Sequence, residues 1–217
     1  MNKSEAESFR EIYFPSCTLV RIGHNGRFVT LRDPANDFLK IDTHPGGSWL
    51  STEEQLMRAS VQFAYPEIDK NEINAVIHLC DIALPNGERT LALQSPDLGT
   101  NIQTSFYKGE LAIQNIPQIT RQVLEAGNSL FQTKGYYNRD LNPSNVIYDH
   151  ATGRTIIIDW YHHFIKTGSD PLYAKTLAGS LVKFLKPFRS FGLEINMLNG
   201  YVSDDILAVL QERIGFT

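Results

Sequence analysis

The chain has few cysteines, little net charge and no long apolar run, and each shortage argues against a class of protein. Its 217 residues include only two cysteines, Cys17 and Cys80, which lie in separate apolar stretches. Their spacing is not that of a metal site, so we expect two reduced core residues in a cytosolic fold. The formal charge of −4 argues against a protein whose main role is to bind a nucleic-acid backbone.

The sequence predicts no membrane partner either. No apolar run approaches the about 18 to 20 residues that are needed to cross a bilayer. The first residues, MNKSEAESFREIYF, lack the apolar core and the cleavage site of a secretory signal peptide. A polar start that contains Ser and Glu suits other export routes equally well, so the route stays open.

What is present is ordinary globular composition, with 42% apolar and 20% charged residues, arranged in two different halves. We expect an N-terminal extension over residues 1–15, a strand-rich lobe over 16–95 and a helix-rich lobe over 96–217. The polar, kinked stretch 95–101 is the best boundary between the lobes, because it contains Pro96 and Gly99. This pattern predicts an α+β chain of two lobes.

Turn residues delimit the predicted elements of both lobes. Asn25-Gly26 between apolar runs is a strong hairpin signal, and a second turn follows at 33–36. Ser51 and Glu54 form a capping box that opens a predicted helix. The expected strands are 18–23, 28–31, 37–41, 75–83, 90–94, 146–148 and 155–158, and the expected later helices are 117–135, 171–188 and 203–214.

The polar residues between these elements match the needs of phosphoryl transfer from ATP. That chemistry requires a cradle for the phosphates, a cation on their oxygens, ligands for Mg²⁺ and a carboxylate that faces the acceptor hydroxyl. The hairpin 23–26 could supply backbone N–H groups, and Lys40 could reach the phosphate oxygens. Asp140 could orient the acceptor, while Asn145 and Asp159 offer the oxygen ligands that Mg²⁺ prefers.

Five segments resemble the motifs of protein kinases and their kinase-fold relatives. The run Arg139–Asn145 resembles the catalytic loop H-R-D-L-x-x-x-N, and Ile158-Asp159-Trp160 is similar to the D-F-G segment. Segment 38–41 resembles the strand that carries the ATP-binding lysine, and 53–57 resembles the helix that carries its glutamate partner. Segment 93–97 resembles the hinge that meets adenine. The resemblance spans about residues 17–165 and implies a two-lobed protein kinase-like fold that uses ATP and Mg²⁺.

The resemblance assigns roles to individual residues. Asp140, Lys40 and Glu53 would be catalytic, with Glu54 as the fallback partner of the lysine. Asn145 and Asp159 would hold Mg²⁺. The ATP-binding set would be Gly23, Asn25, Gly26, Lys40, Gln94 and Ser95.

The sequence differs from the kinase motifs at several positions. Asn138 stands in place of the usual His, Asn142 in place of a Lys common in Ser/Thr kinases, and Trp160 in place of Phe. No A-P-E segment follows, and too few residues remain for the full set of helices in the second lobe. The acceptor, Ser/Thr or Tyr, therefore stays open, although Ser/Thr is favoured.

This shortening resembles the minimal effector kinases that bacteria inject into host cells through type III secretion. The resemblance implies a secreted virulence effector that acts in the host cytoplasm on a host protein, such as the Hsp90 chaperone or a ubiquitin-pathway component. If the effector resemblance does not hold, the bacterial cytoplasm is the expected location.

Other interpretations stay open beside this one. Ile158-Asp159-Trp160 also resembles the ending found in aminoglycoside and choline kinases, although Arg139 and the missing helical insert argue against a small-molecule acceptor. A pseudokinase would be expected to lose Lys40, Asp140, Asn145 or Asp159, and all four are present. Taken singly, Asp140 and Asn145 are ordinary turn and cap residues, Glu53 suits a capping box, and Gly23 and Gly26 suit a type I′ turn.

Overall fold

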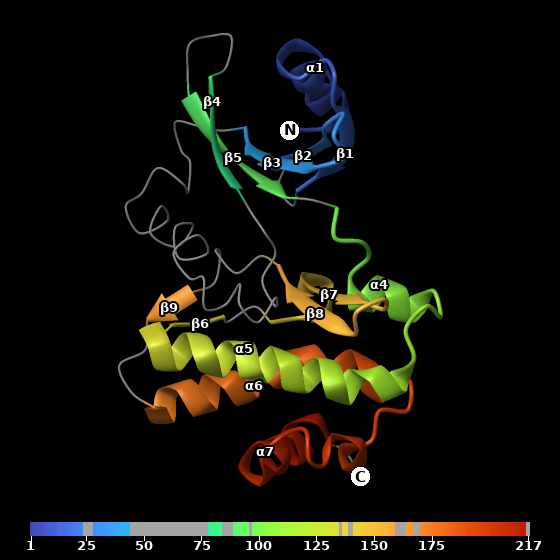
Figure 1. The fold of residues 1–217 in the computed structure, drawn as a ribbon, viewed down its shortest axis with the longest axis vertical. Helices are drawn as coiled ribbons and strands as arrows, with labels where there is room; N and C mark the ends of the chain where they lie inside the picture. Colours follow the sequence, from blue (N-terminus) through green and yellow to red (C-terminus); the bar gives the residue numbers. More distant parts are fainter. Residues whose placement is uncertain are drawn as a thin grey trace. The chain divides into compact units, whose positions relative to one another are not determined.

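The computed structural model describes most of the chain, which folds into two compact units. The described residues are 1–23, 28–43, 78–83, 89–95, 97–134, 136–138, 141–158, 164–166 and 170–215. Those up to Leu98 belong to the first unit and those from Gly99 onward to the second. Both helices and antiparallel strands are present (Figure 1), which confirms the predicted mixed α+β class.

The first unit is built on a five-stranded antiparallel sheet. Its strand order is β1-β2-β3-β5-β4, so the first three strands are consecutive neighbours, as the sequence predicts. The two later strands continue the sheet beside β3 rather than beside β1. The strands are β1 Thr18–Ile22, β2 Phe28–Arg32, β3 Phe38–Asp42, β4 His78–Ala83 and β5 Arg89–Ser95.

One face of this sheet forms the core of the first unit. Val29, Leu31, Ile41 and Ala92 are completely buried, and α1 (Lys3–Tyr13) adds Ala6 to the same cluster. Buried and less buried residues alternate along these strands because successive strand residues point to opposite faces of the sheet. Residues of the predicted N-terminal extension therefore form a helix that packs on the sheet (Figure 1).

The turn between β2 and β3 is closed by its own polar groups. The Asp37 N–H donates to Asp33 Oδ1 at 2.9 Å, and the Asn36 N–H donates to the Asp33 carbonyl at 3.0 Å. Asn36 adopts a left-handed φ of 73°, a conformation that Asn tolerates better than most residues. The predicted turn at 33–36 is thus confirmed.

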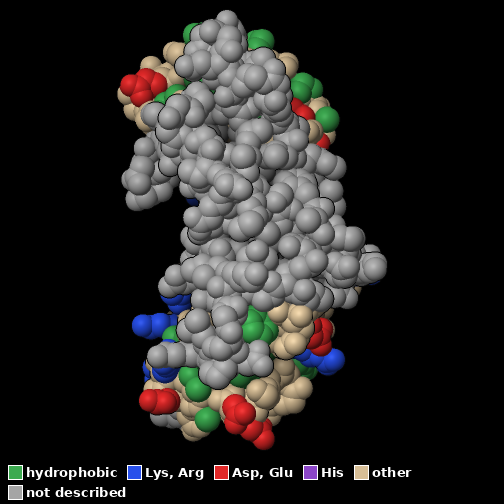
Figure 2. Space-filling view, turned by 90° about the vertical axis from the view of Figure 1, so that its left-hand side faces the viewer, with side chains coloured by type: hydrophobic (Ala, Val, Ile, Leu, Met, Phe, Trp, Pro, Cys, Tyr) green, Lys and Arg blue, Asp and Glu red, His purple; other side chains and the backbone are tan. Residues whose placement is uncertain are grey.

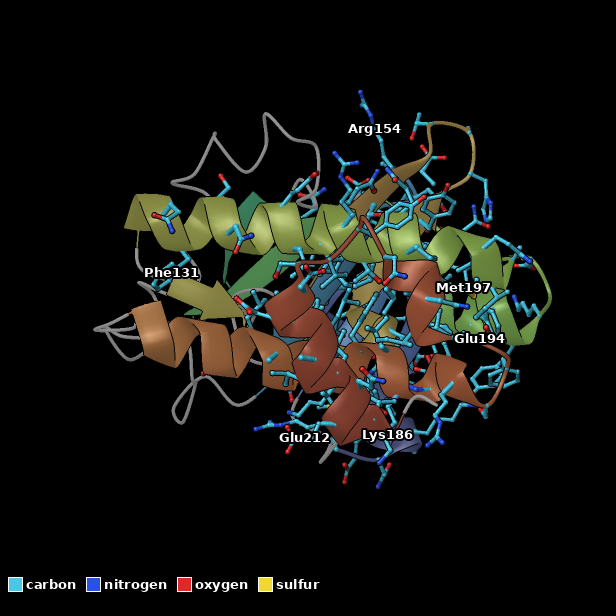
Figure 3. The ribbon with its side chains drawn as sticks, turned by 90° about the horizontal axis from the view of Figure 1, so that it is seen from below. Phe131, Arg154, Lys186, Glu194, Met197 and Glu212 are labelled. Carbon is cyan, nitrogen blue, oxygen red and sulfur yellow. The ribbon has the colours of Figure 1, made fainter. Side chains whose placement is uncertain are left out.

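The second unit consists of helices and two small strand pairs. Helix α5 (Ile116–Lys134) and α6 (Asp170–Arg189) run side by side, and α7 (Asp204–Ile214) packs against α6 (Figures 1 and 3). All three agree with the predicted helices within a few residues. Not predicted were α4 (Ile102–Tyr107), the pair β6 (Tyr136–Asn138) with β9 (Phe164–Lys166), and the 3-10 helices η4 (Ile113–Asn115) and η7 (Ile195–Leu198).

Aromatic side chains join α4 to the end of α6. Phe106 meets Phe188 at 5.2 Å and Phe191 at 5.0 Å between ring centroids, both edge to face. Such pairs add stabilisation beyond the apolar area that they bury. The Arg189 guanidinium then donates to the Ile214 carbonyl at 2.8 Å, which satisfies the end of α7.

The described surface is mixed in charge, and none of the described helices could span a membrane. On the face drawn in Figure 2, Lys and Arg side chains of the second unit lie near Asp and Glu side chains. Within the described residues, no helix combines the length and the apolar character that a bilayer crossing needs.

The hairpin of β7 (Val146–Asp149) and β8 (Arg154–Ile157) is closed by a carboxylate. Asp149 accepts from the Thr152 hydroxyl at 2.6 Å and from the Ala151 N–H at 2.9 Å. These hydrogen bonds, with the one from Thr152 as the largest cause, lower the pKa of Asp149 below its ordinary value because they favour the charged carboxylate.

Gln122 of α5 also holds the β7–β8 turn by donating to the Gly153 carbonyl at 3.1 Å. Arg154, which opens β8, points outward (Figure 3).

We predict that Thr152→Ala raises the pKa of Asp149 toward its ordinary value. Because the folded pKa is depressed, the contribution of this carboxylate to stability is present above the unfolded pKa and is lost as the pH falls through the folded pKa. A carboxyl-carbon NMR titration measures the shift. Thr152→Ser keeps the hydroxyl and should keep the depressed pKa; an unchanged pKa in Thr152→Ala would contradict the assignment.

Candidate functional site

The described part of the predicted catalytic loop lies at the base of the β7–β8 hairpin. Asn145 immediately precedes β7, and its carbonyl accepts the Ile158 N–H at 2.8 Å. This bond extends the strand pairing by one step beyond Val146 and Ile157. Asn145 is therefore held opposite Ile158, the residue that precedes Asp159 in the sequence.

Asn145 sits at the end of a short 3-10 turn, η5 (Pro143–Asn145). Asn142 caps this turn: its Oδ1 accepts the Ser144 N–H at 3.0 Å, and its carbonyl accepts the Asn145 N–H at 3.0 Å. Pro143 suits the first helical position because its ring presets φ and it has no N–H to satisfy. Asn145 is only 8% exposed, and Leu141 beside the loop is buried as well.

Helix α4 supports this turn from within the same unit. It contacts both η5 and β7, and the backbone of Asn101 forms an isolated bridge with Ile147. The Asn101 side chain caps α4 by accepting the Thr104 N–H at 2.9 Å. A helix that the sequence analysis missed therefore holds the loop that carries Asn145.

Lys40 lies at the centre of β3, in the first unit. It pairs with Thr30 of β2 and Leu93 of β5, and it alternates with the core residue Ile41, so it occupies the opposite face of the sheet. Its Nζ lies 5.5 Å from the centroid of the Phe28 ring, within cation–π range. Phe28 is a contact that the motif resemblance did not indicate.

Gly23 closes the first hairpin rather than standing in its loop. Its N–H donates to the Phe28 carbonyl at 2.8 Å. A Cβ on Gly23 would lie 3.1 Å from the Phe28 Cβ, which is tighter than nine in ten contacts of this kind. A larger residue here would require the Phe28 side chain to shift by a few tenths of an ångström. The predicted type I′ turn falls on residues 24–27, outside the described residues, so that turn and nucleotide binding by the Gly23 backbone both stay predictions.

The end of β5 is tied to the β2–β3 turn by two polar contacts. The Gln94 amide donates to Asp37 Oδ2 at 2.9 Å. Arg32 meets Asp97 Oδ2 at 2.9 Å and donates to Asn36 Oδ1 at 3.1 Å. The predicted hinge segment 93–97 is thus held by these side-chain contacts within the first unit. It begins on β5, which pairs with β3, the strand that carries Lys40.

The structure describes only part of the predicted site. Lys40, Gln94 and Ser95 lie on the neighbouring strands β3 and β5, where Ser95 pairs with Phe38 and Leu39 pairs with Gln94. Gly23 lies at the end of β1, and Asn145 belongs to the second unit. Outside the described residues lie Asn25, Gly26, Glu53, Asp140 and Asp159, together with Arg139 and the predicted helix that opens at Ser51.

Asn145 is the one predicted magnesium ligand that lies within the described residues, and its amide oxygen is a donor of the type that Mg²⁺ accepts. Among the residues that the structure describes, no cluster of three His, Cys, Asp or Glu side chains could hold a metal. Mg²⁺, however, commonly takes only one or two protein oxygens and completes its shell with phosphates and water. Asn145 offers a nearly buried amide, and the sequence places the Asp159 carboxylate directly after its hydrogen-bonded neighbour Ile158.

Comparisons with known proteins do not assign a family. No family model matches the chain, and no curated protein matches it significantly. The fold and the local geometry therefore have to support any functional conclusion.

We predict that Asp37 and Gln94 stabilise the first unit as a pair. A double-mutant cycle with Asp37→Ala and Gln94→Ala should give a coupling energy of about 0.5 to 1 kcal/mol, because this hydrogen bond is partly exposed to solvent. Urea unfolding of the four proteins measures it. The exposed pair Arg121–Glu125 on α5 is the control cycle, expected near about 0.3 kcal/mol. Purely additive effects at Asp37 and Gln94 would contradict the pairing.

Proposed function

We propose that the protein is an ATP-dependent phosphotransferase with a protein kinase-like fold, and that it transfers the γ-phosphate to a hydroxyl group of a protein. The observation that carries this proposal is the hydrogen bond from the Ile158 N–H to the Asn145 carbonyl. It supports the kinase-like interpretation because the predicted metal ligand Asn145 is held opposite Ile158, the residue that precedes the other predicted ligand, Asp159, in the sequence. The loop that begins at Asp140 leads directly into the same turn.

Each residue has a distinct task in the proposed mechanism. Lys40 would bind the phosphate oxygens and balance their charge, with Glu53 as its partner. Asp140 would orient the acceptor hydroxyl and take its proton as the new P–O bond forms and the bond to the leaving ADP breaks. Asn145 and Asp159 would hold Mg²⁺, which when bound neutralises charge on the phosphates. Such catalysis works by alignment and electrostatics rather than by a covalent intermediate.

The geometry around Lys40 supports its assignment. A lysine in the middle of a central strand is restrained by pairing on both sides, and the Phe28 ring close to its Nζ favours a cation at that position. Gln94 and Ser95 follow on the adjacent strand, where the predicted hinge begins. The proposal requires Lys40 and Asn145, from different units, to act on the same nucleotide.

We further propose that the acceptor is a host protein and that the chain acts as a secreted bacterial effector in the host cytoplasm. The resemblance to minimal effector kinases supports this, and an Hsp90-type chaperone and ubiquitin-pathway components are the substrates to test first. Small-molecule phosphotransfer is the second candidate, favoured by Ile158-Asp159-Trp160. A pseudokinase is the third.

A radiolabelled-ATP assay with Mg²⁺ separates these candidates. The purified protein is incubated alone, with eukaryotic lysate and with aminoglycosides. We expect label in a discrete lysate protein; label in the drug alone would identify a small-molecule kinase. If no condition gave label, and the wild type transferred no more label than Asp159→Ala, the protein would instead be a pseudokinase.

We predict that Asp159→Ala removes activity, by at least about 100-fold, because a ligand to the catalytic metal is lost. The label transferred per minute to the lysate protein measures it. Asp204→Ala, in the first turn of α7, removes a carboxylate of the same kind away from the hairpin base and should keep wild-type activity. Full turnover in Asp159→Ala would refute the assigned role.

Lys40→Met is expected to lower kcat by about 100-fold or more while the protein remains folded, because Met keeps the apolar stem beside Phe28 and loses the charge. The matched control is Lys183→Met on the exposed face of α6, which should leave kcat unchanged. Equal kcat values for the two variants would contradict a catalytic role for Lys40.

A further inference from the structure

Asn142 stands where many Ser/Thr kinases have a lysine, and the structure gives its side chain a different task. Its Oδ1 is engaged within the turn, where it accepts the Ser144 N–H at 3.0 Å. It also accepts the Ser144 hydroxyl. Asn142 has non-helical backbone angles, φ −143° and ψ 160°, as a capping residue requires. The side chain is therefore directed back into η5.

The Ser144 hydroxyl lies between two amide oxygens. It is hydrogen-bonded to Asn142 Oδ1, and Asn145 Oδ1 lies 3.5 Å from the same hydroxyl oxygen, at the limit of a hydrogen bond. A serine hydroxyl has one hydrogen, so it can donate fully to only one of them at a time. Donation to Asn142 keeps that hydrogen away from Asn145 Oδ1.

A cation and a hydroxyl hydrogen compete for the same lone pairs of an amide oxygen. If Asn142 Oδ1 were removed, the Ser144 hydroxyl could turn its hydrogen to Asn145 Oδ1, 3.5 Å away, the atom expected to hold Mg²⁺. The turn would also lose its cap, and the Asn145 backbone would be held less firmly. Both effects would weaken Mg²⁺ binding by Asn145, although Asn142 itself is not a ligand of the metal.

We propose that Asn142 is a positioning residue for the metal site: it caps the turn that carries Asn145 and holds the Ser144 hydroxyl away from Asn145 Oδ1. This role rests on the proposed function, because it presupposes that Asn145 holds a divalent cation bound to a nucleotide. It also distinguishes this loop from one with a lysine at the position of Asn142, because the asparagine side chain is uncharged and is engaged within the turn. Partners that orient a metal ligand typically contribute about 10- to 100-fold to metal affinity.

The experiment measures how much Mg²⁺ improves nucleotide binding. The Kd of a fluorescent ATP analogue is determined with and without Mg²⁺, and the ratio of the two values is the metal-dependent gain. We expect Asn142→Ala to reduce this gain by about tenfold while the Kd without Mg²⁺ stays within about twofold of wild type. Asn142→Ser keeps a capping oxygen and should retain most of the gain.

Two further variants separate this role from a general loss of stability. Asn2→Ala removes the cap of α1 in the first unit, so it should lower Tm by about 3 °C, like Asn142→Ala, and should keep a normal metal-dependent gain. Ser144→Ala removes the competing hydroxyl and should keep the gain within about twofold of wild type, because the hydroxyl is a competitor and not a ligand.

The outcomes distinguish this inference from the proposed function. A normal gain in Asn142→Ala, an equal loss in Asn2→Ala, no rescue by Asn142→Ser, or a tenfold loss in Ser144→Ala would each overturn the role of Asn142 while nucleotide binding by the wild type remained. No binding of the analogue to the wild type, with or without Mg²⁺, would overturn the proposed function and this role together.

Discussion

The hydrogen bond between the Ile158 N–H and the Asn145 carbonyl is the contact on which the candidate site depends. It is made by the backbone, so it sets the register of the hairpin whatever side chains follow. A slip of one residue would turn every side chain of β8 to the opposite face. Thr155 and Ile157 would then leave the interior, where both are almost completely buried. Burial of the hairpin thus protects the placement of Asn145 opposite Ile158.

The first unit uses the same principle. The register of β2, β3 and β5 places Lys40 between Thr30 and Leu93 and turns Ile41 into the core. A lysine in such a position cannot move to the buried face without exposing an isoleucine, which would cost about 2 kcal/mol or more of burial. Main-chain pairing therefore positions the predicted catalytic cation, and only then do side chains such as Phe28 adjust its surroundings.

Sequence reasoning located elements whose ends carry strong local signals. The turn at 33–36 was predicted from its Asp, Pro and Asn residues, and the structure closes it with short-range hydrogen bonds. Helix α4 was missed because it has only six residues, too few for apolar periodicity. The three-residue strands β6 and β9 were missed because their pairing joins segments that are distant in the sequence.

For the candidate site too, local sequence signals predicted some residues, whereas contacts between distant residues could not be predicted. Asn145 and Lys40 were predicted from motif order, and the structure gives each a defined place in its unit. The contact of Gln94 with Asp37 joins residues 57 positions apart, and the approach of Lys40 to Phe28 follows from strand register; no local pattern encodes either. The cap formed by Asn142 did have a local signal, since Asn followed by Pro is typical of a helical start. The resemblance to kinases, in which this position often holds a lysine, does not indicate that cap.

The closing of the first hairpin by Gly23 and Phe28 has a consequence for how this protein could diversify. Because the Gly23 N–H is bonded to the Phe28 carbonyl, a substitution at position 23 that displaced Phe28 would also displace β2 and, through the pairing of β2 with β3, the strand of Lys40. Variation at position 23 would thus be limited to residues that the Phe28 side chain can accommodate by a small shift.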